Sequence, residues 1–292
     1  MNVAAFFATF PVALPIFALL LGLIIGSFLN VMIYRLPIMM QREWTQQCHE
    51  FLELEENAEA AASQSVFNLA SPASHCPHCQ HEITAMENIP VLSFLLQGGK
   101  CKQCRGKISL RYPLVEAATG LLSMLVVLGF GFTWLSLSVL ILTWSLIALS
   151  MIDFDHQLLP DDICLPLLWL GLIVNYFGLL VPLDAAVIGA IAGYLILWCV
   201  YWAFKLLTGK EGMGQGDFKL LAALGAWMGW QALPQIILLS AFVGSIVGIS
   251  LILFRGQDKN IPIPFGPYLA GAGFIALLWG EQISQAYNSL LM

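Results

Sequence analysis

Charged residues are scarce in this chain. Of its 292 residues only 10% are Asp, Glu, Lys or Arg, whereas 59% are hydrophobic. Soluble globular domains carry about 25% charged residues, so this composition excludes an ordinary water-soluble domain. Stretches of roughly 20 apolar residues, the length that crosses about 30 Å of hydrocarbon, recur along the chain. The sequence therefore predicts an all-α polytopic membrane protein.

Several enzyme signatures are also missing. The sequence has no His-Glu-x-x-His motif for a catalytic zinc, no Gly-x-Ser-x-Gly elbow and no Ser-x-x-Lys dyad. It also lacks the Gly-x-Gly-x-x-Gly turn that binds dinucleotides. His156 is the only histidine outside the segment 36–112, and no local signature surrounds it. These absences argue against metal-dependent and Ser–His hydrolysis and leave carboxylate chemistry as the main alternative.

Hydropathy predicts about eight transmembrane helices. They lie near residues 12–34, 113–131, 134–152, 162–181, 184–206, 219–231, 234–254 and 264–281. Only sixteen residues separate Asp217 from Pro234, so spans six and seven are either short and tilted or a re-entrant pair. Span 1 has no basic segment before it and is expected to be a retained helix. Its "GLIIG" offers small residues four apart for close helix packing.

The basic residues set the predicted orientation. All twelve Lys and Arg residues fall in or beside loops on one side of this arrangement. Loops rich in Lys and Arg stay in the cytoplasm. We therefore expect both termini to lie outside the cytoplasm and the loop between spans 1 and 2 to lie inside it.

That loop is a polar insertion, because the apolar periodicity stops there. The chain is thus divided into a first transmembrane helix (1–35), a cytoplasmic insertion (36–112) and a transmembrane core (113–292). An acidic helix is expected over 48–64. Its glutamates serve solubility in the simplest interpretation, and attraction of a basic partner is the alternative.

The insertion also contains two matched cysteine motifs, "CPHCQHEI" and "CKQCRGKI". Two Cys-x-x-Cys knuckles supply four thiolates, enough to close a tetrahedral zinc site with no position left for water. A structural zinc ion is therefore predicted. Its expected ligands are Cys76, Cys79, Cys101 and Cys104. A redox dithiol fits two matched pairs less well, and the histidines between 75 and 81 are not needed as ligands.

Two aspartates lie at the ends of predicted spans. Asp153 begins "DFDHQLLPD" at the end of span 3, and Asp217 follows "GMGQG" at the start of span 6. Ionisable groups at a bilayer edge are costly and are functional candidates by default. Spans 4 and 5 form an out-and-back pair, so both aspartates should lie on the cytoplasmic face. Asp161 and Asp162 follow a proline before span 4, where a helix N-cap accounts for them.

Two carboxylates at one level can share a proton. One then acts as a base toward water while the other, protonated, polarises a carbonyl, as in aspartic proteases. We expect Gly212, Gly214 and Gly216 to adopt positive φ and to let the backbone approach a substrate strand closely. The alternative is a flexible connector in which Asp217 is a favourable charge at a helix N-terminus.

The chain resembles the bacterial type IV prepilin leader peptidases that are also N-methyltransferases. The similarity extends from span 1 to span 8 through blocks in the expected order. They are "GSFLNVMIYRLP", the two cysteine knuckles, "RYPLVEAATG", "DFDHQLLPD", "GMGQGDFKL" and "PFGPYLA". The Gly-x-Gly-Asp element from Gly214 to Asp217 is the most specific of them.

The resemblance implies an aspartic endopeptidase of the bacterial inner membrane whose catalytic pair is Asp153 and Asp217, with Asp155 as a competitor for the first position. Gly214 and Gly216 would form the substrate loop. The implied substrates are type IV prepilins and type II secretion pseudopilins, cut after a glycine behind a short basic leader.

The same enzyme would methylate the new N-terminus with S-adenosylmethionine. This methyl donor is a second cofactor in addition to the structural zinc ion. No motif locates the methyl-donor site. Glu116, near the start of span 2, either faces the sulfonium cation of S-adenosylmethionine or is a favourable negative charge at a helix N-terminus. Partners are the pilin substrates and the lipid bilayer, without nucleic acid. The alternatives are a transporter or channel with a zinc-stabilised module and an assembly scaffold.

Overall fold

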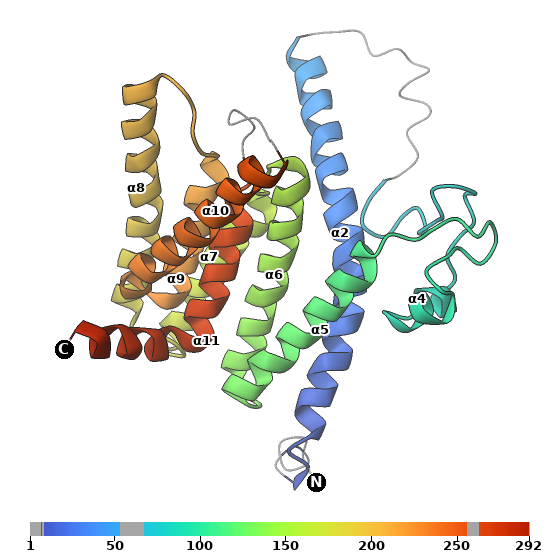
Figure 1. Ribbon diagram of the computed structural model, residues 1–292, viewed down its shortest axis with the longest axis horizontal. Coiled ribbons are helices and arrows are strands. Elements are labelled where there is room, and N and C mark those ends of the chain that lie inside the picture. Colours follow the sequence, from blue (N-terminus) through green and yellow to red (C-terminus); the bar gives the residue numbers. More distant parts are fainter. Residues whose placement is uncertain (1–6, 8, 53–66, 256–262, 292) are drawn as a thin grey trace. The chain divides into compact units, whose positions relative to one another are not determined.

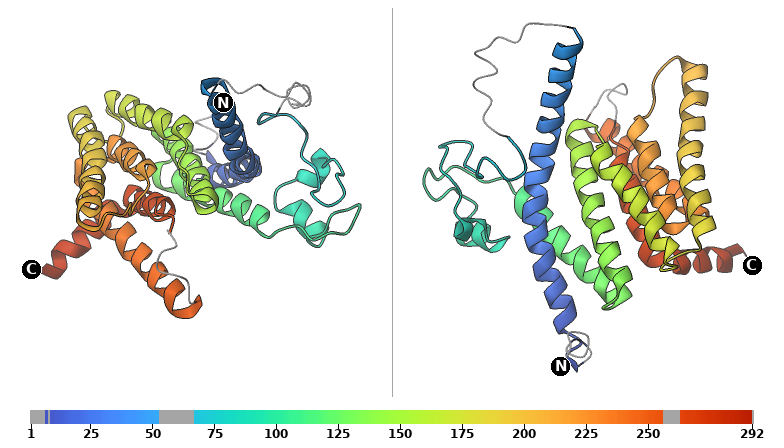
Figure 2. Two further views of the ribbon diagram at one scale, coloured as in Figure 1. Left: turned by 90° about the horizontal axis from the view of Figure 1, so that it is seen from above. Right: turned by 180° about the vertical axis from the view of Figure 1, so that it is seen from behind.

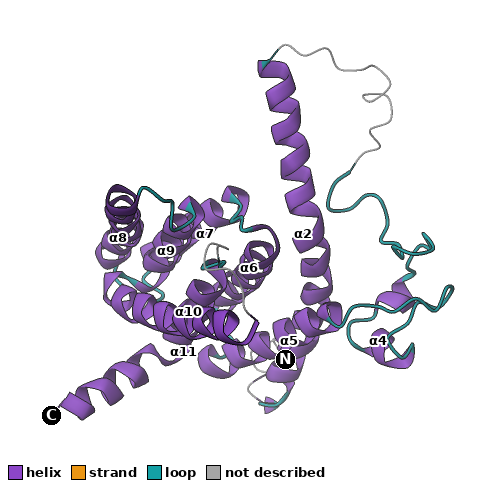
Figure 3. Ribbon diagram, turned by 45° about the horizontal axis from the view of Figure 1, so that its top comes forward, coloured by secondary structure: helices purple, strands orange, loops and turns teal. Residues whose placement is uncertain are grey.

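The computed structural model describes the chain except for residues 1–6, 8, 53–66, 256–262 and 292 (Figure 1). Its regular elements in the described ranges are helices, and two isolated antiparallel bridges are the only β pairing there (Figure 3). The prediction of an all-α fold is confirmed. The chain separates into two compact units, Met1–Leu128 and Gly129–Met292.

The first unit is built on the helices α2 (Ala13–Phe51) and α5 (Arg111–Phe130). A 3-10 turn, η1 (Ala85–Asn88), and the short helix α4 (Leu92–Leu96) lie in the loop between them. Helix α2 is a single continuous rod (Figure 2). Its 39 residues correspond to about 58 Å, well beyond the bilayer core of about 30 Å.

Helix α2 therefore does not end where the hydropathy falls. It passes through Pro37 and continues into the predicted insertion, because "QREWTQQ" consists mostly of polar residues that favour helix. The expected acidic helix over 48–64 is helical to Phe51, and its remainder from 53 onward lies outside the described residues. Loss of apolar periodicity marked a change of environment here, and the helix itself did not stop.

Glycines bring α2 and α5 into close contact. A Cβ atom added at Gly22 would lie 2.6 Å from the Ser123 hydroxyl oxygen, and one at Gly26 would lie 2.7 Å from the Cα of Glu116. Neither position has room for a side chain. The close packing predicted from "GLIIG" is confirmed, since both of its glycines are in this contact.

The second unit is a helical bundle. Its elements are α6 (Trp134–His156), α7 (Asp161–Tyr176), α8 (Leu183–Thr208), α9 (Gln215–Met228), η2 (Trp230–Ala232), α10 (Leu233–Arg255) and α11 (Gly266–Leu291). Helix α9 lies at the centre, in contact with α7, α8, α10 and α11. Eleven of its fourteen residues are buried, so it is enclosed by protein rather than by lipid.

Within the described residues, five helical segments are long and apolar enough to cross a membrane. They are α2, α5, α6, α8 and the stretch Trp230–Phe254. A helix lies at each of the eight predicted spans, but α9 has only 14 residues, about 21 Å, against a hydrocarbon core of about 30 Å. The multi-pass membrane prediction is supported, whereas the count of about eight full spans is not confirmed. In α9 the apolar sequence reflects burial inside the bundle.

Helices α8 and α9 touch through their backbones. The Cβ of an alanine at Gly225 of α9 would overlap the backbone of Gly189 in α8, and a Cβ at Gly193 would lie 2.6 Å from the Leu221 carbonyl oxygen. This contact sets α9 in its place.

We expect Gly225→Ala to lower the melting temperature of the detergent-solubilised protein, because an added methyl group must separate α8 from α9. Overpacking of this kind costs about 1–3 kcal/mol. Gly271→Ala is the matched control, since Gly271 lies in helix α11 with nothing within 4 Å of an added Cβ. Equal melting temperatures for wild type and Gly225→Ala would contradict the proposed tightness of the α8–α9 contact.

Candidate active site and metal centre

Asp153 lies in the last turn of α6 and is buried, with 6% of its surface exposed. The helix closes behind it with Gln157 in the left-handed conformation, and the Gln157 N–H donates to the Asp153 carbonyl at 2.9 Å. The carboxylate itself accepts a hydrogen bond of 2.9 Å from the backbone N–H of Gly266, the first residue of α11. Asp153 is thus oriented by a helix N-terminus 113 residues away.

Asp217 lies in the first turn of α9 and is buried to a similar extent, with 5% exposed. Gly214 is the N-cap residue, and a Cβ added to it would lie 3.6 Å from the Asp217 carboxylate. A carboxylate in the first turn is favoured by the helix dipole. The first turn of α9 therefore places the Asp217 carboxylate inside the bundle, where the positive end of the helix dipole favours its negative charge.

The fold brings the two predicted aspartates together. Leu159 packs between their supports, because a Cβ at Gly216 would lie 2.7 Å from the Leu159 Cβ and one at Gly266 would lie 3.2 Å from its Cδ2. Two buried carboxylates from α6 and α9 thus share one apolar site.

The glycine interpretation needs one correction. Gly212, Gly214 and Gly216 are not among the glycines with positive φ, and Gly214 has φ −74°. Gly216 lies within α9, where a right-handed helical backbone is required. The expectation of positive φ is therefore wrong. The absence of a side chain matters instead, since it admits Leu159 against Gly216 and the Phe204 ring against Gly212.

Asp155 differs from Asp153 in its surroundings. It lies two residues further along α6 and is exposed. Successive residues of a helix are rotated by about 100°, so a separation of two directs the side chains to nearly opposite faces. Asp153, rather than Asp155, is therefore the buried carboxylate at the end of α6.

Sequence reasoning missed an ion pair at this site. The Lys219 ammonium lies 2.6 Å and 2.7 Å from the two carboxylate oxygens of Asp161, in the first turn of α7. The N-cap residue of α7 is Pro160, and it makes no side-chain cap hydrogen bond. The N-cap explanation of Asp161 is therefore wrong. Neither sequence block around Asp161 or Lys219 contained a local signal for this ion pair, because the two residues lie 58 positions apart.

The loop before α9 is held against α8 by a second polar group. Glu211 accepts hydrogen bonds from the Lys205 ammonium at 2.7 Å and from the Tyr201 hydroxyl at 3.1 Å. The Lys205 hydrogen bond lowers the pKa of the Glu211 carboxyl. Tyr201 also contacts the Phe218 ring edge-on, with centroids 5.7 Å apart. The residue after Asp217 is thus packed against the group that anchors the loop.

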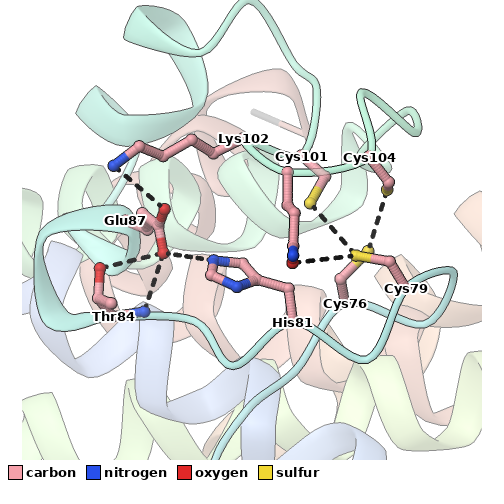
Figure 4. A network of polar contacts seen from close by, with 9 residues as sticks. Cys76, Cys79, His81, Thr84, Glu87, Cys101, Lys102 and Cys104 are labelled. Carbon is pink, nitrogen blue, oxygen red and sulfur yellow. Dashed lines mark hydrogen bonds and ion pairs between the residues drawn. The ribbon is translucent and has the colours of Figure 1, made fainter.

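The four predicted cysteines meet in the first unit. Their Sγ atoms all lie within 4.8 Å of one another, with Cys76 to Cys104 at 3.8 Å and Cys79 to Cys101 at 4.0 Å (Figure 4). A tetrahedral site with Zn–S bonds of about 2.3 Å requires S–S separations of about 3.8 Å. The predicted cluster is confirmed, and its spacing fits a zinc ion.

The two knuckles repeat the same local structure. Cys76 N–H donates to the His81 carbonyl and Cys101 N–H to the Gly106 carbonyl, each at 2.8 Å. Backbone N–H groups also point at the sulfurs, and those of Cys79 and His78 lower the pKa of the Cys76 thiol to about 7. The backbone N–H groups of Cys104 and Gln103 likewise lower the pKa of the Cys101 thiol, so one cysteine of each hairpin is shifted toward the thiolate, the form that binds metal. The backbone hydrogen bond from His81 to Cys79 is instead outweighed by burial and the neighbouring thiols, which raise the pKa of Cys79 to about 12.

Glu87 connects the two knuckles from outside the cluster. Its carboxylate contacts His81 at 3.2 Å and Lys102 at 3.6 Å, and it accepts two hydrogen bonds of 3.0 Å from Thr84 (Figure 4). The Thr84 backbone N–H is the main cause that lowers the pKa of Glu87 to about 2. His81 is therefore a partner of Glu87 rather than a substitute ligand, as the complete four-cysteine shell led us to expect.

Arg35 joins this module to α2. The guanidinium is buried and donates to the carbonyl oxygens of Asn68 at 2.9 Å and Pro72 at 2.6 Å. Arg42, two turns further along α2, lies 4.4 Å above the Phe67 ring. The extended helix α2 thus provides the surface on which the chain leading to the first knuckle is fixed.

Glu116 is a further tie in the first unit. It is buried on α5, and its carboxylate accepts a 2.7 Å hydrogen bond from the backbone N–H of Val91, at the start of α4. Val91 has a positive φ of 59°, unusual for a branched residue. This contact accounts for the buried position of Glu116 as an anchor of the loop.

Two family models match the chain. The bacterial peptidase A24 N-terminal domain matches residues 20–130, and the type IV leader peptidase family matches residues 140–249. The boundary between them falls beside the division between the two structural units at residue 128. No solved structure matches the chain.

Curated relatives cover the chain almost completely. A prepilin leader peptidase/N-methyltransferase of Stutzerimonas stutzeri is 58% identical over 98% of each chain. Proteins of the same name from Pseudomonas aeruginosa and Pseudomonas putida are 57% and 54% identical, covering 97% and 100% of this chain and 96% and 99% of their own. Matches of this extent extend through both units, and this chain belongs to the type IV leader peptidase family.

Proposed function

We propose that the chain is a membrane aspartic endopeptidase that removes the leader of type IV prepilins and type II secretion pseudopilins, and that it then N-methylates the new N-terminus. The observation that carries the peptidase half is that Asp153 and Asp217 are both buried, at helix ends whose glycines pack on the same residue, Leu159. The chain is also similar throughout to proteins of that name. The membership of this chain in the type IV leader peptidase family supports both the cleavage and the methylation.

The two carboxylates perform the hydrolysis as a pair that shares one proton. The ionised carboxylate takes a proton from a water molecule, whose oxygen attacks the scissile carbonyl carbon. The protonated partner donates to the carbonyl oxygen, which gives a tetrahedral intermediate. This intermediate collapses as the C–N bond breaks, the carboxyl that took the water proton gives it to the departing amine, and a hydroxyl proton returns to the other carboxylate. Gly266 N–H holds one oxygen of Asp153, which leaves its other oxygen for water or substrate. Gly214 leaves open space beside Asp217, since the one atom within 4 Å of an added Cβ is a carboxylate oxygen of Asp217 at 3.6 Å, whereas Leu159 fills the space over Gly216.

The orientation of substrate and enzyme follows from charge. The Lys and Arg residues of the chain favour a cytoplasmic location for the insertion and for the start of α9, in the inner membrane. A basic leader stays on the cytoplasmic side for the same reason. Its cleavage site would then meet Asp153 and Asp217 at the membrane edge, while the apolar pilin helix remains in the bilayer.

The four cysteines would hold a structural zinc ion. Their spacing fits tetrahedral coordination, and four thiolates leave no open position for water. The metal would stabilise a segment with little apolar core of its own. For the methylation, S-adenosylmethionine supplies the methyl group that the amine released by cleavage accepts.

We expect Asp153→Asn and Asp217→Asn each to lower cleavage of a purified prepilin by at least about 100-fold, because each removes one partner of the acid–base pair. Asp155→Asn is the matched control, since Asp155 is exposed on the same helix turn. Cleavage is measured in liposomes by the mobility shift of the pilin. Methylation of a pre-cleaved pilin by the same variants reports that they are folded. Full cleavage by Asp217→Asn would refute the aspartyl mechanism.

Metal analysis of the purified protein should give one zinc ion per chain. Cys79→Ser or Cys101→Ser should lower that content and make the segment around the knuckles sensitive to protease, because three thiolates no longer complete the shell. Cys48→Ser should retain the full content, since Cys48 is exposed and outside the cluster. Equal zinc in all three variants would rule out these ligands.

A further inference from the structure

We propose that the ion pair between Asp161 and Lys219 is a positioning device for the peptidase reaction, which fixes Asp217 at its working distance from Asp153. This inference rests on the proposed peptidase function and assigns it two further residues. Neither would touch the substrate. Both would act through the placement of helix α9.

The geometry of the pair is well suited to this task. Both oxygens of Asp161 lie within 2.7 Å of the Lys219 ammonium. The side chains are partly exposed, at 50% and 31%. Ion pairs at such positions contribute little to overall stability. A stability role is therefore a poor explanation, whereas two short contacts to one ammonium still define a position.

The register on α9 relates the pair to catalysis. Lys219 follows Asp217 by two residues, and a rotation of about 100° per residue directs the two side chains to nearly opposite faces. Asp217 is buried while Lys219 reaches the partly exposed rim. Holding Lys219 at the rim therefore fixes the rotation of α9 that points Asp217 into the site.

Helix α9 is tied to α7 at both ends. At its C-terminal end, the Trp227 indole N–H donates to the Leu167 carbonyl at 2.9 Å, and the Asn175 amide donates to the Ala226 carbonyl at 2.8 Å. At its N-terminal end the polar tie to α7 is the contact of Lys219 with Asp161. Between these ends α9 packs through apolar side chains and small residues and lies close against the α8 backbone, without a side-chain hydrogen bond that the structure assigns there to α7.

Asp161 in turn is close in sequence to the other carboxylate. It lies eight positions after Asp153, and the turn between them contains the left-handed Gln157 and the packed Leu159. The ion pair thus connects the start of α7, which follows Asp153 at the end of α6, to the start of α9, which carries Asp217.

The test is steady-state cleavage of a purified prepilin by full-length enzyme in liposomes. The variants are Asp161→Asn, Lys219→Gln and the double variant, with Asp162→Asn as the control. Asp162 shares the first helical turn of α7 and therefore the same helix-end effect. We expect the two single variants to lower kcat by about 10- to 100-fold with KM within about twofold, since small misplacements of reacting groups have effects of this size. Asp162→Asn should match wild type.

Two further readouts separate positioning from folding. The double variant should lose no more kcat than the worse single variant, because the pair acts as a unit. Methylation of pre-cleaved pilin should stay at the wild-type rate in every variant. Should a neutral variant fail this folding check, Lys219→Arg carries the test, because arginine retains the charge and can bind a carboxylate with two hydrogen bonds. It should keep most of the wild-type kcat.

Unchanged kcat in both single variants would overturn the proposal, as would a loss in Asp162→Asn equal to that in Asp161→Asn. Multiplied losses in the double variant, or a kcat of Lys219→Arg as low as that of a neutral variant, would also overturn it. Failure of the proposed peptidase function looks different. If the chain were not a peptidase, the wild type would not cleave the prepilin. If it did not use the aspartyl pair, Asp217→Asn would cleave as well as wild type.

Discussion

The burial of helix α9 is the constraint on which the rest of the second unit depends. A helix of fourteen residues does not reach across a bilayer, so its apolar surface must be covered by protein. Gly189 of α8 and Gly225 of α9 allow the two backbones to touch, which leaves no layer of side chains between them. The enclosure has a chemical consequence. It carries the first turn of α9, with Asp217, into an interior from which lipid and bulk water are largely excluded, where electrostatic interactions are stronger than at a surface.

The two units are stabilised in different ways. In the first, glycines pack α2 against α5, while the knuckle segment depends on polar ties: the thiolate cluster, Glu87 and the Arg35 guanidinium. In the second, packing of apolar helices predominates and the polar contacts are few and specific. The two family models divide the chain at nearly the same point. Chemistry that needs thiolates and chemistry that needs buried carboxylates are therefore held by separate packing arrangements, each suited to its residues.

The sequence predicted those features whose signal is local. Cysteine spacing identified the four sulfurs, and hydropathy located a helix at each predicted span, because both are properties of short windows. Span count along the chain also brought Asp153 and Asp217 to one level without any contact information. Three features escaped prediction. Helix α2 continues past Pro37 because polar residues sustain a helix outside the bilayer. The shortness of α9 marks enclosure by neighbours, and the partner of Lys219 lies 58 residues away.

The glycines contribute to the site by lacking a side chain and not by adopting positive φ. Gly216 and Gly266 each stand at the start of a helix, and both pack on Leu159, so the N-termini of α9 and α11 converge on one point. Helix N-termini carry partial positive charge and favour nearby anions. Asp217 benefits from its own helix, whereas Asp153 lies at the unfavourable C-terminal end of α6 and receives the N–H of Gly266 from α11 instead. Two helix ends thus lie where the proposed carboxylate pair would hold its single negative charge, and side chains at either glycine would keep these helix ends apart.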